Sequence, residues 1–188
     1  MYTYTINEKK EAPMLTTYTK IYADIVSRAT FGQVEQASKW YLDAETVARE
    51  VATNLNATLE IGATVVSAFS PRERWARNVM NAVKFSLGEE MTGVLGNNTR
   101  MAEKGLTVGF DALKGLKTNA FARAIAGNEN AVVIDVWMLR ALGIEKKTPN
   151  RTQYNEMATA VTIVAGMHGM TPRAMQALIW IVVRGSGE

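Results

Sequence analysis

The sequence predicts an all-α fold, and three observations indicate it. Apolar side chains recur at helical spacing through most of the 188 residues. No segment shows the strict alternation of a half-buried strand, and we find no repeat or low-complexity tract. With 47% hydrophobic residues, the chain has the composition of an ordinary globular protein. We therefore treat residues 1–188 as a single globular unit.

The first third of the chain predicts three helices. Residues 1 to about 13 carry alternating Tyr and Thr and then a charged run, so we expect a loosely held arm there. A helix is expected from about Thr16, and a second from 34 to 54, because each carries an apolar stripe. A third helix, 58–68, is almost wholly apolar, as expected for a buried element.

The Ser70-Pro71 pair predicts the start of the next helix. Serine is a favoured N-cap, and proline is tolerated in the first turn because its missing N–H costs nothing there. This helix carries Arg72, Arg74 and Arg77. Cations at a helix start are disfavoured by roughly 0.3–1 kcal/mol each. The three arginines therefore indicate either a phosphate partner or a solvated face.

Glycines break up residues 88–109, where we expect only short helical pieces. Residues 110–113 are expected to form a short helix and 114–116 a turn, and a helix follows from Lys117 to about Ala126. His168 is expected to lie at a helix end. The remaining predicted helices are 136–142, 151–166 and 172–184.

Lys117 and Asp135 stand eighteen residues apart, each at the start of a predicted helix. The positive end of a helix dipole favours an ionised carboxylate and disfavours an ammonium. An amine and a carboxylate held together can cut an N-glycosidic bond, the amine as nucleophile and the carboxylate as a stabiliser of positive charge. The alternative interpretation is structural, with the aspartate as an N-cap and the lysine as a solvated side chain.

The residues around this pair resemble a known family. Gly115-Leu116-Lys117-Thr118, followed by Ile134 to Gly143, resembles the core of the helix-hairpin-helix DNA glycosylases of the endonuclease III type. There a Gly-x-Gly-x-Lys-Thr hairpin precedes Val-Asp-Thr-His-Val-x-Arg at the same interval. Thr64 to Pro71, continued by Asn78, is similar to the family's Leu-Leu-Ser-Ala-Gln-Thr segment.

Over residues 37–184 the chain looks still more like the small phage and actinobacterial members of this superfamily, which lack the iron–sulfur cluster. The shared features are Trp40-Tyr41 with Ala44, Ser70-Pro71 with Trp75 and Asn78, Leu116-Lys117 with Ala120-Phe121, Ile125-Ala126-Gly127, and Asp135 with Trp137.

The resemblance implies a two-lobed helical fold with a cleft between the lobes. One lobe would comprise about 14–56 plus 131–188, and the other about 57–130 with a degenerate hairpin. It also implies Lys117 and Asp135 as the catalytic residues. The implied substrate- or DNA-binding residues are Phe69 as a wedge, Trp137 as a pocket wall, and Arg72, Arg74, Arg77, Lys114, Gly115 and Arg140.

Three departures from the family pattern concern DNA contacts. Leu113 replaces the first hairpin glycine, so one of the two glycines that bring backbone amides to a phosphate is lost. Trp137 stands in place of a histidine, and Phe69 in place of a glutamine that fills the gap left by an extruded base. An aromatic side chain can still wedge into a base stack.

Composition limits the remaining possibilities. The chain has no cysteine and one histidine, which rules out disulfides, thiolate metal sites and the iron–sulfur cluster of endonuclease III, and makes a histidine-based centre an unpromising hypothesis. We expect no metal or cofactor. The net charge of +3 requires any DNA-binding cations to be concentrated in one region. We see no secretory signal or membrane-spanning run and expect a bacterial or phage-infected host cytoplasm.

The leading hypothesis is therefore a DNA base-excision glycosylase, with or without AP-lyase activity, acting on a flipped modified or damaged base. One alternative is a phage-type enzyme that hypermodifies bases on the same fold. Another is a non-catalytic module that binds DNA or a host component, and a further one is a helical scaffold with no nucleic-acid role. The sequence predicts neither the target base, nor a preference for single or double strands, nor the oligomeric state.

Overall fold

A computed structural model describes residues 8–185, with side chains from residue 14 onward, and this part of the chain is all-α. The fold class predicted from the sequence is confirmed. The elements are α1 (Glu8–Ser27), α2 (Phe31–Asn54), α3 (Leu59–Phe69), α4 (Trp75–Leu87), α5 (Gly96–Val108), the 3-10 turn η1 (Gly109–Ala112), α6 (Leu116–Ile125), α7 (Val136–Ala141), α8 (Arg151–Met167) and α9 (Pro172–Arg184).

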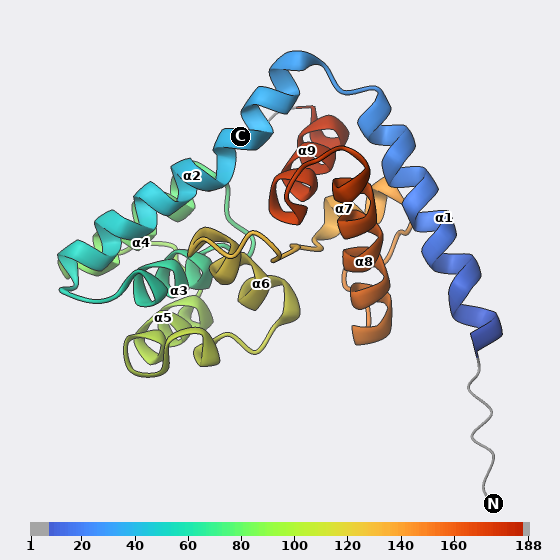
Figure 1. Cartoon of the computed structure of the whole chain (residues 1–188). Helices are drawn as coiled ribbons and strands as arrows, with labels where there is room; N and C mark the ends of the chain where they lie inside the picture. Colours follow the sequence, from blue (N-terminus) through green and yellow to red (C-terminus); the bar gives the residue numbers. More distant parts are fainter. Residues whose placement is uncertain (1–7, 186–188) are drawn as a thin grey trace, which may run out of the picture.

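The α3 helix is the buried centre of one group of helices, together with α2, α4, α5 and α6 (Figure 1). Every residue of α3 from Gly62 onward is buried. Two glycines allow neighbouring helices to approach closely: Gly62 lies against Ala48 and Ala52 of α2, and Gly105 of α5 lies against Thr64. Since a side chain at either glycine would meet its neighbour, the backbone spacing in this group depends on their absence.

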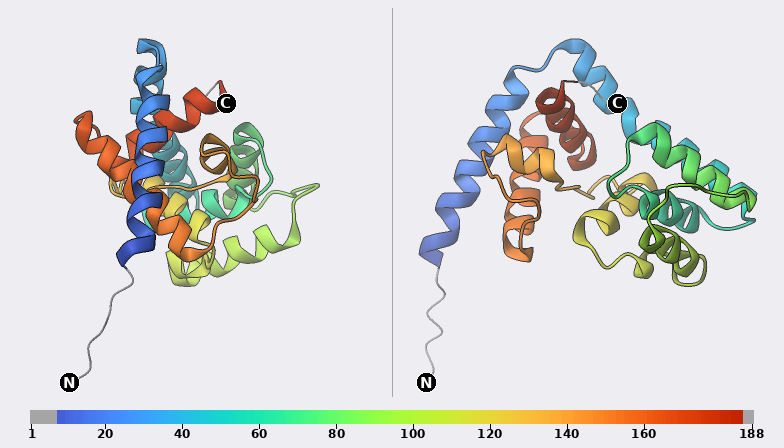
Figure 2. Two further views of the ribbon diagram at one scale, coloured as in Figure 1. Left: turned by 90° about the vertical axis from the view of Figure 1, so that its right-hand side faces the viewer. Right: turned by 180° about the vertical axis from the view of Figure 1, so that it is seen from behind.

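The α2 helix joins this group to a second one, formed by α1, α7, α8 and α9 (Figure 1). Near the middle of α2, the Tyr41 hydroxyl donates a hydrogen bond of 2.6 Å to Oε1 of Gln176 in α9. Further along α2, Ala48 packs on α3. The chain crosses between the groups a second time after α6, through a buried extended segment, 131–134 (Figure 2).

Side-chain hydrogen bonds fix this extended segment. The Tyr154 hydroxyl donates to the carbonyl of Val132 at 2.8 Å and accepts from the N–H of Ile134 at 3.3 Å. Burial raises the pKa of Tyr154 to about 12, the Ile134 hydrogen bond opposes this rise, and the Asp135 charge adds to it. The hydroxyl therefore stays protonated near neutral pH and can donate. Asp135 directly follows this anchored segment.

Most predicted helices are confirmed, including α9 with the predicted bounds, and His168 is the C-cap of α8. The predicted arm was too long, because α1 begins at Glu8; residues 1–7 lie outside the described range. The segment 8–12 is rich in good helix formers, which explains the earlier start. The prediction of only short helical pieces in residues 88–109 was also wrong in part, since α5 runs unbroken from Gly96 to Val108.

The helix predicted at Ser70-Pro71 begins only at Trp75. Ser70 is instead the C-cap of α3, and its hydroxyl donates to the carbonyl of Ser67 at 2.8 Å. Arg72 has a positive φ of 65°, which no right-handed helix contains. The prediction rested on the local chemistry of Ser70 and Pro71 alone. In the structure the serine caps the end of α3 and does not cap the start of α4.

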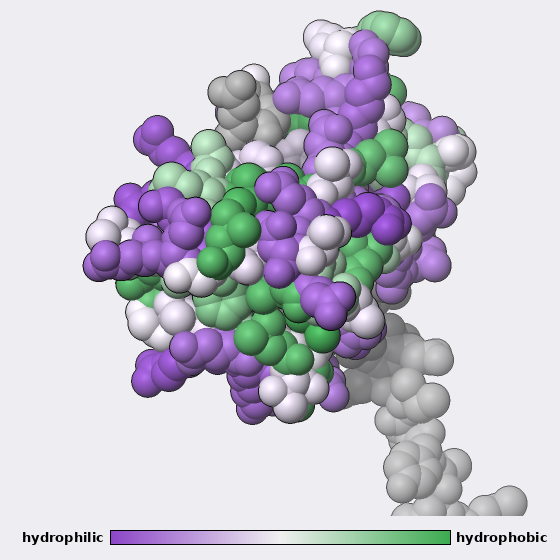
Figure 3. All heavy atoms as spheres, turned by 90° about the vertical axis from the view of Figure 1, so that its left-hand side faces the viewer, coloured by the Kyte–Doolittle hydropathy of each residue, from purple (hydrophilic) through white to green (hydrophobic). Residues whose placement is uncertain are grey.

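Hydrophilic and hydrophobic side chains are interspersed over the face that carries the first group of helices (Figure 3). In the part of the chain that the structure describes, no helix has the length and apolar character needed to cross a membrane.

Candidate functional site

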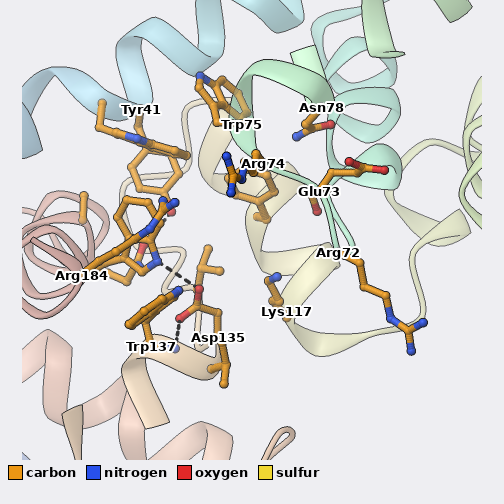
Figure 4. Close-up of a pocket in the computed structure, with 18 residues that line it drawn as sticks. Tyr41, Arg72, Glu73, Arg74, Trp75, Asn78, Lys117, Asp135, Trp137 and Arg184 are labelled. Carbon is orange, nitrogen blue, oxygen red and sulfur yellow. Dashed lines mark hydrogen bonds between the residues drawn. The ribbon is translucent and has the colours of Figure 1, made fainter. Parts of the chain in front are cut away.

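A cavity of about 350 Å³ contains both Lys117 and Asp135 in its lining (Figure 4). This volume lies near the lower end of the ~300–1,000 Å³ typical of small-molecule sites. The cavity draws on both groups of helices. Its lining residues are Trp40, Tyr41, Ser70, Arg72, Glu73, Arg74, Trp75, Asn78, Lys117, Phe121, Val133, Asp135, Val136, Trp137, Gln176, Ala177, Trp180 and Arg184.

Asp135 is held by three N–H donors. As the N-cap of α7, it accepts through Oδ1 from the backbone N–H groups of Trp137 at 2.9 Å and Met138 at 3.1 Å. Its Oδ2 accepts from the indole N–H of Trp180 at 3.1 Å (Figure 4). All three donors are neutral, so none of them is a counter-ion to the carboxylate. A preorganised anion of this kind can stabilise positive charge that develops beside it.

Lys117 lies in the first turn of α6, on the other side of the cavity from Asp135 (Figure 4). The Ser67 hydroxyl of α3 donates to the carbonyl of Thr118 at 2.7 Å, which ties the start of α6 to the buried core. In the part of the chain whose side chains are described, the ion pairs lie elsewhere and none includes Lys117. The half-buried lysine is therefore available to a ligand.

Aromatic rings form one wall of the cavity. Trp40 lies at their centre, with ring centroids 5.3 Å from Trp75, 5.9 Å from Phe121 and 6.1 Å from Trp180. Flat, partly apolar walls of this kind suit the faces of a planar ring. Trp40 and Trp75 were among the residues that carried the resemblance, but the sequence predicted no shared pocket wall for them. Helical spacing alone does not separate a core aromatic from one that lines a pocket.

The buried pair Tyr41 and Gln176 closes the same wall. Burial, with the Asp135 carboxylate nearby, raises the pKa of Tyr41, so its hydroxyl remains a donor at neutral pH. Because that hydroxyl donates to Gln176 Oε1, the carbonyl end of this amide is already engaged.

The other predicted site residues are distributed unevenly. Trp137 and Arg74 line the cavity, whereas Arg140 lies 4.5 Å over the Trp137 ring without being in the lining. Lys114 and Gly115 are exposed in the turn before α6 and lie outside the cavity.

Two predicted DNA contacts are engaged within the protein itself. Arg77 donates to the carbonyl of Gly93 at 3.1 Å and pairs with Glu73 at 3.4 Å, so it fastens the segment after α4. The prediction of Phe69 as a wedge was wrong. Its side chain is fully buried and packs on Phe85 at 5.5 Å, so it cannot reach a base stack. Phe69 ends a helix that is buried from Gly62 onward, and it belongs to the core.

Arg72 borders the cavity, but its guanidinium points away from Asp135 (Figure 4). Its φ of 65° is unfavourable for a residue with a Cβ. We expect Arg72→Gly to raise the free energy of unfolding by about 1 kcal/mol, measured by urea denaturation. Binding to the cavity should not change. A loss of stability would show that the arginine side chain makes a contact that offsets the backbone strain.

In the residues with described side chains, no group of three or more His, Cys, Asp or Glu could hold a metal ion.

Fold and cavity together define a class: all-α proteins in which an amine and a carboxylate share an aromatic-walled pocket. The chain belongs to the family of unknown function DUF7178, whose model matches residues 5–187. Searches of curated proteins and of solved structures gave no match.

Proposed function

We propose that this protein is a DNA base-excision glycosylase with AP-lyase activity, acting on a base flipped into the Lys117–Asp135 cavity. The observation that carries the proposal is that both residues line one pocket (Figure 4). The pocket has aromatic walls for stacking a base that has left the duplex. The helix-hairpin-helix resemblance, with a cleft between two helical lobes, supports the same reaction class.

The chemistry follows from the two groups. Cleavage of the bond between base and sugar builds positive charge at the anomeric carbon, which the Asp135 carboxylate would stabilise. After losing a proton, the Lys117 amine would attack this carbon, forming a C–N bond while the base leaves with the electron pair of the glycosidic bond and takes up a proton. Opening of the sugar ring then gives a Schiff base, from which the strand breaks by elimination of the 3′-phosphate.

Cations at the mouth suit a nucleic-acid backbone. Arg74 and Arg184 line the cavity with Lys117, and Arg184 lies 4.7 Å over the Trp180 ring. Of the two carboxylates in the lining, Glu73 is paired with Arg77. The presence of these cations beside the cavity supports a nucleic-acid backbone as its partner.

Borohydride trapping tests this function. Wild-type protein is incubated with single- and double-stranded DNA carrying a panel of base lesions, and sodium borohydride reduces any Schiff base to a stable adduct. We expect a covalent adduct with wild type and none with Lys117→Ala, because Lys117 carries the only amine in the cavity lining among the residues whose side chains the structure describes. Lys114→Ala, three residues earlier and outside the cavity, is the matched control and should still be trapped.

Two other outcomes would change the proposal in different ways. Base release that persists in Lys117→Ala, without strand scission, would show that the first step needs only Asp135. No adduct and no released base across the panel would contradict a glycosylase. Mass spectrometry of nucleosides from modified phage DNA would then test the hypermodification alternative.

A further inference from the structure

Asn78 directs the nitrogen of a buried amide into the cavity. The residue lies near the start of α4, is 2% exposed and lines the cavity, with its amide nitrogen on the cavity side (Figure 4). Its Oδ1 is buried in the protein. Among the residues whose side chains the structure describes, Nδ2 has no hydrogen-bond acceptor. Buried polar side chains normally have partners, so this free donor indicates a ligand that supplies an acceptor.

The orientation of the amide decides which kind of ligand group it can bind. The carbonyl oxygen of Asn78 is inside the protein, and its two N–H donors are on the cavity side. A reversed amide would place two donors, instead of one oxygen, in that buried position, where an unpaired polar group costs about 1–3 kcal/mol. The amide therefore offers the cavity a donor and no acceptor.

The other amides clarify this arrangement. Gln176 also lines the cavity, and its Oε1 accepts from the Tyr41 hydroxyl at 2.6 Å, so its nitrogen is the end left for a ligand. Asn81, about one turn further along α4, has the reverse arrangement: its Nδ2 is the inaccessible, unpartnered atom, and the residue does not line the cavity. The two amides of the described lining thus have the same polarity, and Asn81 provides a comparison outside it.

We propose that Asn78 selects the substrate by donating a hydrogen bond from Nδ2 to a carbonyl oxygen of the flipped base. The inference rests on the proposed function and deepens it by naming the substrate class. This class is the keto bases, which carry a carbonyl oxygen where amino bases carry an NH2 group. An amino base would bring its own N–H donors against those of Asn78, and donors on both sides would stay unpaired.

Binding of matched oligonucleotides tests this inference without turnover. Fluorescence anisotropy measures the affinity of wild-type protein for labelled single strands with one variable base, either uracil against cytosine or hypoxanthine against adenine. A 2′-fluoro group on the variable nucleotide disfavours positive charge at the anomeric carbon and so prevents cleavage. Single strands avoid an unpairing cost that differs between bases. We expect the keto base of at least one pair to bind about tenfold more tightly, as leaving a buried donor unpaired implies.

Asn78→Leu and Asn81→Leu form the matched variant pair, because leucine has nearly the shape of asparagine. Asn78→Leu should bind the keto base about tenfold more weakly and lose the preference for it. Its midpoint of urea unfolding should equal or exceed that of wild type, since the unpaired Oδ1 has been removed. Asn81→Leu should keep the preference. Asn78→Asp, which replaces the nitrogen by an oxygen, should shift the preference toward the amino base.

The results that overturn the inference are separate from those that overturn the glycosylase. Equal binding within both pairs, tighter binding of the amino bases by wild type, or an undiminished keto preference in Asn78→Leu or Asn78→Asp would each refute it. If the keto preference depends on Asn78 but borohydride traps no adduct, the specificity role stands and the proposed cleavage fails. If adducts form without any keto preference, the glycosylase stands and Asn78 does not select the base.

Discussion

Replacing Asp135 by asparagine is expected to lower the rate of base release by roughly 100-fold or more, the usual effect of removing one group that stabilises transition-state charge. Asparagine is as good an N-cap as aspartate, so its oxygen can still accept from Trp137 and Met138, and α7 should remain capped. Its amide nitrogen would then face the Trp180 indole N–H, where Oδ2 now accepts at 3.1 Å. The substitution removes the charge and places two donors together.

Single-turnover release of base, quantified by chromatography, measures this effect, and thermal unfolding measures the fold. We expect the rate to fall much further than stability does. Trp180→Phe is the informative comparison, because it removes the indole donor but keeps the carboxylate charge, and should therefore cost less in rate. Unchanged base release in Asp135→Asn would assign the aspartate to the capping of α7 alone.

The sequence predicted those parts of the structure that depend on local signals. The bounds of α9 and the capping position of Asp135 follow from spacing and helix-start chemistry, which a linear reading captures. The placement of Lys117 and Asp135 in one cavity depends on Ser67 and Tyr154, which fasten distant segments. The family resemblance implied that Lys117 and Asp135 lie in one site, whereas their spacing in the sequence did not.

The errors come from competition between neighbouring elements. Ser70 has the side chain of a good N-cap, but in the structure it is the C-cap of α3, and four residues separate it from the start of α4 at Trp75. Phe69 matched a position associated with DNA, but it completes a helix whose residues are buried on all sides from Gly62 onward. The sequence did not predict the aromatic wall of the cavity, because the pattern cannot show that a residue of a core stripe is partly open. Trp40 and Trp75 are only partly buried, and no periodicity reveals which side of a tryptophan remains open.

Gly62→Ala is expected to have the largest effect on stability, lowering the free energy of unfolding by about 3 kcal/mol, at the upper end of typical overpacking. A Cβ at this position would collide with the Ala48 carbonyl oxygen and lie 2.9 Å from the Ala52 Cβ. Both obstacles belong to α2, and one is backbone, so no side-chain rotation relieves the contact. Helices α2 and α3 would have to separate, which would also move Ser67 and hence the start of α6.

Gly166→Ala supplies the matched control, because this exposed glycine lies within α8 and a Cβ there would meet nothing within 4 Å. Alanine is the better helix former, so that variant should gain about 0.5 kcal/mol. Urea denaturation followed by circular dichroism measures both variants. The opposite signs separate close helix packing from helix propensity, since both substitutions add the same methyl group to a helical glycine. A Gly62→Ala variant as stable as wild type would mean that α2 and α3 can move apart at little cost, and that the spacing around the Lys117–Asp135 cavity is adaptable.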